Sequence, residues 1–106
     1  MRTLAVVGLL GDLDRGELTA WIERGWVCPD AAEGGEWEFH EIDVARVRLI
    51  RDLRRTMELP EDTVELVLSL LDQVYDLRAT LHGVRQAIAA QPEAVRAAIA
   101  AALEKQ

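Results

Sequence analysis

Few residues in this chain could perform covalent or acid–base chemistry, and they lie far apart in the sequence. The 106 residues include one serine, Ser69, and two histidines, His40 and His82. Ser69 falls in a predicted helix with no neighbouring base that could activate it. Neither histidine has a second histidine or a cysteine at ligand spacing, so we expect no metal and no cofactor. Because no pair of carboxylates in an apolar pocket is recognisable either, we expect a protein that is not an enzyme.

The single cysteine, Cys28, lies in the segment WVCP, next to Pro29 and between apolar residues. One cysteine excludes an intrachain disulfide. A thiol in apolar surroundings is usually buried and inert, and we expect that here; the alternative is a reactive thiol.

The charge of the chain is unevenly distributed. Residues 1–44 hold three arginines and ten acidic residues, a net charge of −7, whereas residues 45–106 hold nine of each sign. A surface of this sign repels nucleic-acid phosphates and attracts basic proteins. The predicted electrostatic partner site consists of Asp12, Asp14, Glu17, Glu23, Glu33, Glu36 and Glu38. The alternative for each is an ordinary solvated acid, and helix capping alone accounts for Asp14 and Glu17.

The apolar segment Thr3–Leu10 could be a helix or a strand, and we predict a helix. Its outer positions Ala5, Val6 and Val7 then form an apolar patch, which would mark an interface with a partner. The alternatives are burial against a second protomer, or a strand.

A second helix is predicted from the capping box of Asp14 and Glu17, and it ends at Gly25. Its core positions are Leu18, Trp21, Ile22 and Trp26. Between Trp26 and His40, the turn PDAAEGG and the alternating Trp37 and Phe39 predict a small β-hairpin. We expect Trp21 and Trp26 in the core, whereas Trp37, near the hairpin tip, is a candidate anchor for a partner.

Two further helices follow. Residues 41–58 place Ile42, Ala45, Leu49, Leu53 and Met57 along one stripe, with the arginines largely outside it. Pro60 stops that helix. From Val64 onward, apolar residues recur in steps of three and four over roughly three heptads, which predicts a coiled-coil seam. The seam consists of Val67, Leu70, Val74, Leu77, Leu81, Val84 and Ile88.

We expect this seam to pair two chains into a homodimer, because the helix is longer than the small core before it. The alternative is packing on its own domain. Gly83 could mark a bend in the helix. The predicted organisation is a domain over residues 1–60, a dimerisation helix over 61–91 and an alanine-rich helical tail over 92–106. No apolar run is long enough to cross a bilayer and no export signal is recognisable, so we expect a cytoplasmic protein.

This order of elements resembles the MerR-like winged-helix family, and two segments support the resemblance over residues 3–91. LTAWIERGWVCP resembles the family pattern LRYYEexGLLxP at Leu18, Trp21, Glu23, Gly25 and Pro29. EWEFHEID resembles the pattern YRxYxxxD, where the wing leads into a helix, at Phe39 and Asp43. The resemblance implies a mainly α fold with a small β-hairpin wing: a winged helix-turn-helix followed by a long dimerisation helix.

The departures from that family concern its DNA contacts. Thr19 and Ala20 occupy the positions of its DNA-contacting arginine and tyrosine, and Trp37 stands between two glutamates where the wing arginine belongs. Base and phosphate contacts are therefore both missing. Within the superfamily the chain is similar to the chaperone-modulatory proteins called CbpM. That similarity implies binding to the J-domain of a CbpA/DnaJ-like co-chaperone and inhibition of its stimulation of DnaK. The alternative is a MerR-like transcription regulator that binds DNA as a dimer.

Overall fold

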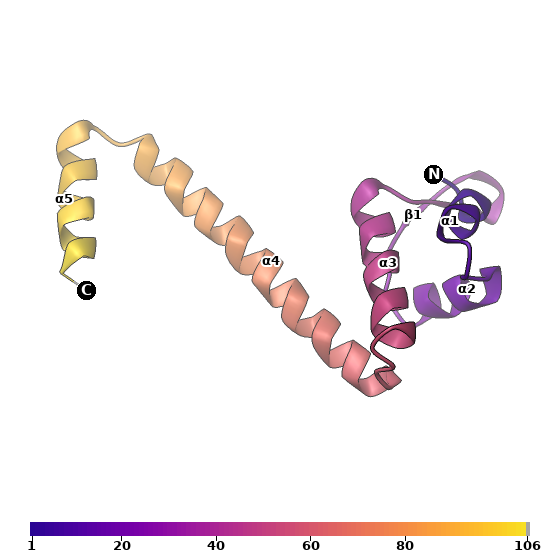
Figure 1. Ribbon diagram of the computed structural model, residues 1–106. Helices are drawn as coiled ribbons and strands as arrows, with labels where there is room; N and C mark the ends of the chain where they lie inside the picture. Colours follow the sequence, from indigo (N-terminus) through magenta and orange to yellow (C-terminus); the bar gives the residue numbers. More distant parts are fainter. Residues whose placement is uncertain (106) are drawn as a thin grey trace. The chain divides into compact units, whose positions relative to one another are not determined.

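The computed structural model describes residues 1–105, and over that range the chain is mainly helical with one small antiparallel hairpin (Figure 1). The elements are α1 (Thr3–Leu10), α2 (Arg15–Glu23), β1 (Asp30–Ala31), a 3-10 turn (Glu33–Gly35), β2 (Trp37–Glu38), α3 (Glu41–Arg55), α4 (Glu61–Ala89) and α5 (Glu93–Glu104). They follow one another in the order that the sequence predicts. The chain divides into two compact units, residues 1–68 and the residues from 69 onward, so the boundary falls within α4.

The first apolar segment is a helix, as predicted, but its buried face differs from the expected one. Val6 and Leu10 are buried in the core of the first unit, whereas Leu4 and Leu9 are exposed. The prediction that Val6 is an outer position available to a partner is therefore wrong. Gly11 closes the helix with a φ of +71°, a conformation that favours glycine.

The start of α2 confirms half of the predicted capping box. Oδ1 of Asp14 accepts a hydrogen bond of 2.7 Å from the backbone N–H of Glu17. The side chain of Glu17 does not reach back, because it forms an ion pair with Arg55 of α3 instead. Gly25, with a φ of +75°, ends the helix where the sequence predicts.

The hairpin pairs Asp30 with Glu38 and Ala31 with Trp37. Its turn contains Gly34 and Gly35, both at positive φ, which explains why glycines are needed there. The next residue, Phe39, is buried, and its N–H donates to the carbonyl oxygen of Met1 at 2.7 Å. The hairpin is thereby attached to the beginning of the chain.

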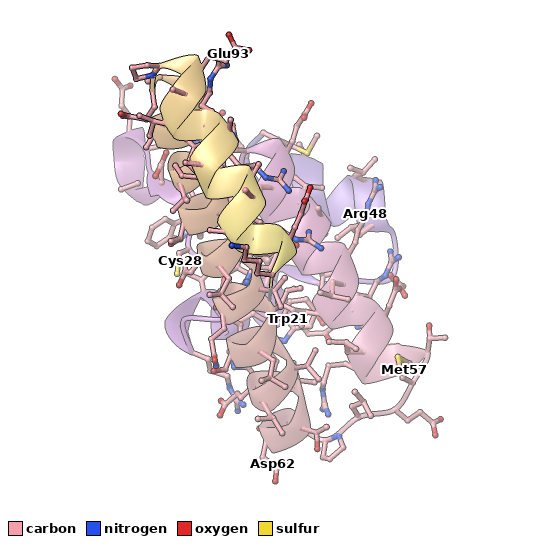
Figure 2. All side chains as sticks on the ribbon, turned by 90° about the vertical axis from the view of Figure 1, so that its left-hand side faces the viewer. Trp21, Cys28, Arg48, Met57, Asp62 and Glu93 are labelled. Atoms are coloured by element: carbon pink, nitrogen blue, oxygen red, sulfur yellow. The ribbon has the colours of Figure 1, made fainter. Side chains whose placement is uncertain are left out.

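The buried face of α3 was predicted only in part. Leu53 is buried and Leu49 is partly buried against the core, as predicted. Ile42 and Met57, however, are 68% and 61% exposed, and Val47 and Ile50 are buried instead. The observed face is therefore displaced around the helix axis from the predicted stripe toward Val47 and Ile50. Met57 lies beyond the last residue of α3, at the outer edge of the view in Figure 2.

The arginines of α3 explain this displacement. The guanidinium of Arg46 donates to the carbonyl oxygen of Trp26, that of Arg51 to Leu10 O at 3.3 Å, and that of Arg54 to Leu59 O at 2.7 Å. Their aliphatic stems cover apolar surface while their charged ends bind backbone carbonyls. Sequence periodicity treats these residues as solvated, although all three are partly buried.

The core of the first unit gathers apolar side chains from every helix up to the first turns of α4. It consists of Val6, Leu10, Leu13, Leu18, Trp21, Trp26, Val27, Phe39, Val47, Ile50, Leu53, Val64 and Leu68. Trp21 and Trp26 are buried as predicted, with ring centroids 6.4 Å apart. Cys28, by contrast, is exposed, so the prediction of a buried thiol is wrong. Val27 and Pro29 on either side of it turn inward, which leaves Cys28 facing out.

The second unit contains the rest of α4 together with α5. Helix α4 is helical through Gly83, with no interruption at that residue. Most of the predicted seam is exposed in the single chain, with Leu77 at 69%, whereas Val67 is partly buried against the core of the first unit and Ile88 is also partly buried. No helix among residues 1–105 is both long and apolar enough to span a membrane.

Candidate functional site

The acids near the α1–α2 turn are neutralised by arginines of α3. The carboxylate of Asp12 lies 3.6 Å from the guanidinium of Arg51 and 3.3 Å from that of Arg55. Arg55 also contacts Glu17. These acids therefore attach the α1–α2 region to α3. Their negative charge is already neutralised by the arginines of α3.

The acids of the hairpin are neutralised in a similar way. Oε1 of Glu36 lies 3.8 Å from Arg15, and Oε2 of Glu38 lies 3.0 Å from Arg2. Glu38 also accepts a hydrogen bond of 2.9 Å from the N-terminal amine, and this bond is the main reason why the pKa of its carboxyl is lowered. Trp37 is partly buried against the core, so only part of its indole is open to a partner.

Two of the predicted acids remain available. Glu23, at the end of α2, and Glu33, in the hairpin turn, are exposed and make no side-chain hydrogen bond or ion pair within residues 1–105. Asp14 is occupied as a helix cap. The predicted acids therefore do not gather into one carboxylate cluster: Asp12 and Glu17 share Arg55, and the others form separate ion pairs, a helix cap or single exposed charges.

His40 joins the hairpin to α3. Its Nε2 lies 2.7 Å from Oδ2 of Asp30, and its backbone N–H donates to Oδ2 of Asp43 at 2.8 Å. The hydrogen bond to Asp30 is the main reason why the pKa of His40 is raised. Since a protonated imidazole binds the carboxylate more strongly, this contact responds to pH.

Sequence reasoning missed an open groove of about 560 Å³ on the first unit. It is lined by Met1, Leu9, Phe39, His40, Glu41, Val44, Ala45 and Arg48. A signal for it was present, because α3 carries apolar residues on two faces and only one face can meet the core. Ala45, which was assigned to the core stripe, lies on the second face.

Arg48 differs from the other arginines of α3. Within the described residues 1–105, each of Arg46, Arg51, Arg54 and Arg55 binds a carbonyl or a carboxylate of the chain. Arg48, labelled in Figure 2, makes no such contact in that range, is exposed and lines the groove. It is a cation available to an external carboxylate.

No group of three or more potential metal ligands lies together among residues 1–105. Comparison of the chain with known protein families, with curated proteins and with solved structures found no match.

Proposed function

We propose that this protein is a cytoplasmic, homodimeric adaptor of the MerR-like winged helix-turn-helix type. It binds the J-domain of a CbpA/DnaJ-like co-chaperone and inhibits the stimulation of DnaK by that co-chaperone. It acts by binding, without catalysing a reaction.

The observation that supports this proposal most directly is that the three arginines of residues 1–44 already pair with acids of the same chain. Arg15 pairs with Glu36, Arg2 with Glu38, and Arg24 with Glu61 at 2.5 Å. DNA binding needs cations that can replace the counterions of phosphates. A face whose guanidinium groups are neutralised internally is poorly suited to that role.

The net charge supports a basic partner. Residues 1–68 carry eight arginines and fifteen acids, so this unit retains a charge of −7 after its ion pairs are counted. J-domains present a basic helix surface when they engage DnaK, and an acidic unit that covers this surface would compete with DnaK. Charge complementarity of this kind acts mainly on the association rate and on partner choice.

The exposed surface supports the proposed homodimer. The seam of α4 supplies apolar side chains for such an interface: Leu70, Val74, Leu77, Leu81 and Val84 are all exposed.

The proposal is tested by calorimetric titration of the full chain against the purified J-domain at two salt concentrations. A parallel titration uses duplex DNA fragments. We expect saturable J-domain binding that weakens as salt is added, and no DNA binding. DNA binding without J-domain binding would replace the proposal with a MerR-like transcription regulator.

A further inference from the structure

We infer that the groove beside α3 is an interface between copies of this chain, and that it receives helix α5 of a second copy. The inference rests on the proposed homodimer but not on the proposed J-domain partner. It assigns a role to two surfaces that the proposed function leaves unused: the groove in the first unit and the apolar stripe of α5 in the second.

Helix α5 needs a packing surface. A 12-residue helix is marginal in water by itself, so its stability depends on burying one face. Val95, Ile99 and Leu103 follow at intervals of four and form an apolar stripe, yet Val95 and Leu103 are exposed in the single chain. The alanines on either side of the stripe are small, which allows a second helix to approach closely.

The groove offers a matching apolar floor. Leu9 of α1, which is half exposed, lines the groove together with Phe39 and with Val44 and Ala45 of α3. On α3, the groove residues Glu41, Val44, Ala45 and Arg48 follow at the spacing of one helix face. An amphipathic helix with anchors one turn apart is the kind of ligand that fits such a groove.

The charged residues that line the groove are complementary to those of α5. Glu41 and Arg48 stand seven residues apart on α3, about 10.5 Å along the axis at 1.5 Å per residue. On α5, Arg96 and Glu104 flank one side of the apolar stripe eight residues apart, about 12 Å. All four are exposed and make no side-chain hydrogen bond or ion pair within residues 1–105. With α5 parallel to α3, Arg96 meets Glu41 and Glu104 meets Arg48.

A second copy can satisfy both surfaces at once. In a closed two-fold dimer each surface is used twice, so one groove and one α5 per chain give two equivalent contacts. The apolar stripe of each α5 is then covered by the groove of the other copy.

Charge reversal tests this arrangement in the full-length chain. Arg48→Glu and Glu104→Arg each place like charges at both contacts of a homodimer, and we expect roughly tenfold weaker self-association by sedimentation equilibrium. An equimolar mixture of the two variants should recover the wild-type dissociation constant. In the mixed dimer, one contact pairs Arg48 with Glu104 and the other has both charges reversed. Asp76→Arg makes the same charge change at an exposed position of α4, away from α5 and from the groove, and should leave the dissociation constant unchanged.

The outcomes separate this inference from the proposed homodimer. Wild-type self-association in both single variants would overturn the docking of α5 and leave the homodimer standing. Weakened single variants whose mixture does not recover would show that residues 48 and 104 do not meet across the two copies, and would overturn the inference. A wild-type chain that stays monomeric at all concentrations would remove the homodimer itself.

Discussion

The indole Nε1 of Trp26 donates a hydrogen bond of 3.1 Å to Oε1 of Glu65. Trp26 belongs to the core of the first unit, and Glu65 lies in the second turn of α4. The guanidinium of Arg24 sits 5.3 Å from the centre of the Trp26 ring and also pairs with Glu61. One aromatic side chain and two acids thus attach the start of the long helix to the core.

Removing the carboxylate of this contact should destabilise the first unit. We expect Glu65→Ala to lower the free energy of unfolding by about 1–2 kcal/mol, because the buried indole N–H loses a charged acceptor, although the exposure of Glu65 reduces the effect. Urea denaturation followed by tryptophan fluorescence measures the change. Asp76→Ala, on an exposed part of the same helix, is the control and should have little effect. Equal stability of the two variants would show that the hydrogen bond contributes nothing.

The buried face of α3 can be tested with two isoleucines on one helix. Ile50→Ala should cost about 2–5 kcal/mol because it leaves a cavity in the core. Ile42→Ala removes the same atoms from an exposed position and should stay within about 0.5 kcal/mol of wild type. Thermal or urea unfolding of both variants provides the measurement. The opposite order of effects would support the stripe that sequence periodicity predicts.

The contact between His40 and Asp30 should make stability depend on pH. Since the folded-state pKa of His40 is raised, its contribution is complete below the unfolded value of about 6.5 and is lost as pH rises through the folded value. NMR titration of the imidazole measures the shift directly. We expect Asp30→Asn to lower the pKa of His40 and to flatten the stability profile in this range. An unchanged His40 titration in Asp30→Asn would exclude Asp30 as the cause.

The role of the α4 seam as a dimer interface can be tested by placing one acidic residue in it. Leu77→Asp should convert the proposed dimer to a monomer, because a coiled-coil interface would have to bury an unpaired carboxylate. Sedimentation velocity distinguishes the two states. Gln86→Asp introduces the same charge off the seam and should leave the dimer intact. A Leu77→Asp chain that associates like wild type would exclude this seam as the interface.

The J-domain site can be tested at acids that have no structural partner. Glu33→Lys should weaken J-domain binding and reduce its salt dependence, because it reverses an exposed charge in the hairpin turn without breaking an ion pair. Reversing Glu36 or Glu38 should also weaken the complex, but it additionally releases Arg15 or Arg2 from an ion pair. Calorimetry at two salt concentrations gives both quantities. Asp76→Lys is the control, and equal effects from Glu33→Lys and Asp76→Lys would exclude a specific role for the hairpin.

Local signals predicted most of the secondary structure. The Asp14 cap, the stop at Gly25 and the glycines of the hairpin turn each act within a few residues, so the sequence pattern contains the information. The alternation of Trp37 and Phe39 likewise placed the second strand of the hairpin.

Long-range contacts limited the rest. Glu17 fits a capping box by spacing but pairs with Arg55, 38 residues away. Arg51 reads as a solvated residue, yet its guanidinium binds Leu10 O from the neighbouring helix. Val6 was assigned to the surface because its helix is apolar on every side, and only tertiary packing decides which side is covered. The candidate partner site was predicted least well, because an acid can bind a partner only if no arginine of the chain pairs with it, and those arginines lie far away in the sequence.

The pairing of Arg15 with Glu36 has an evolutionary consequence. In this pair the glutamate neutralises the arginine, so substitution of the glutamate would expose a guanidinium beside the hairpin. Because residues 1–68 carry a net charge of −7, each such loss of a glutamate makes this unit less acidic by one charge and exposes one guanidinium beside the hairpin. The preference of the surface for basic partners would thus weaken in single steps, one substitution at a time.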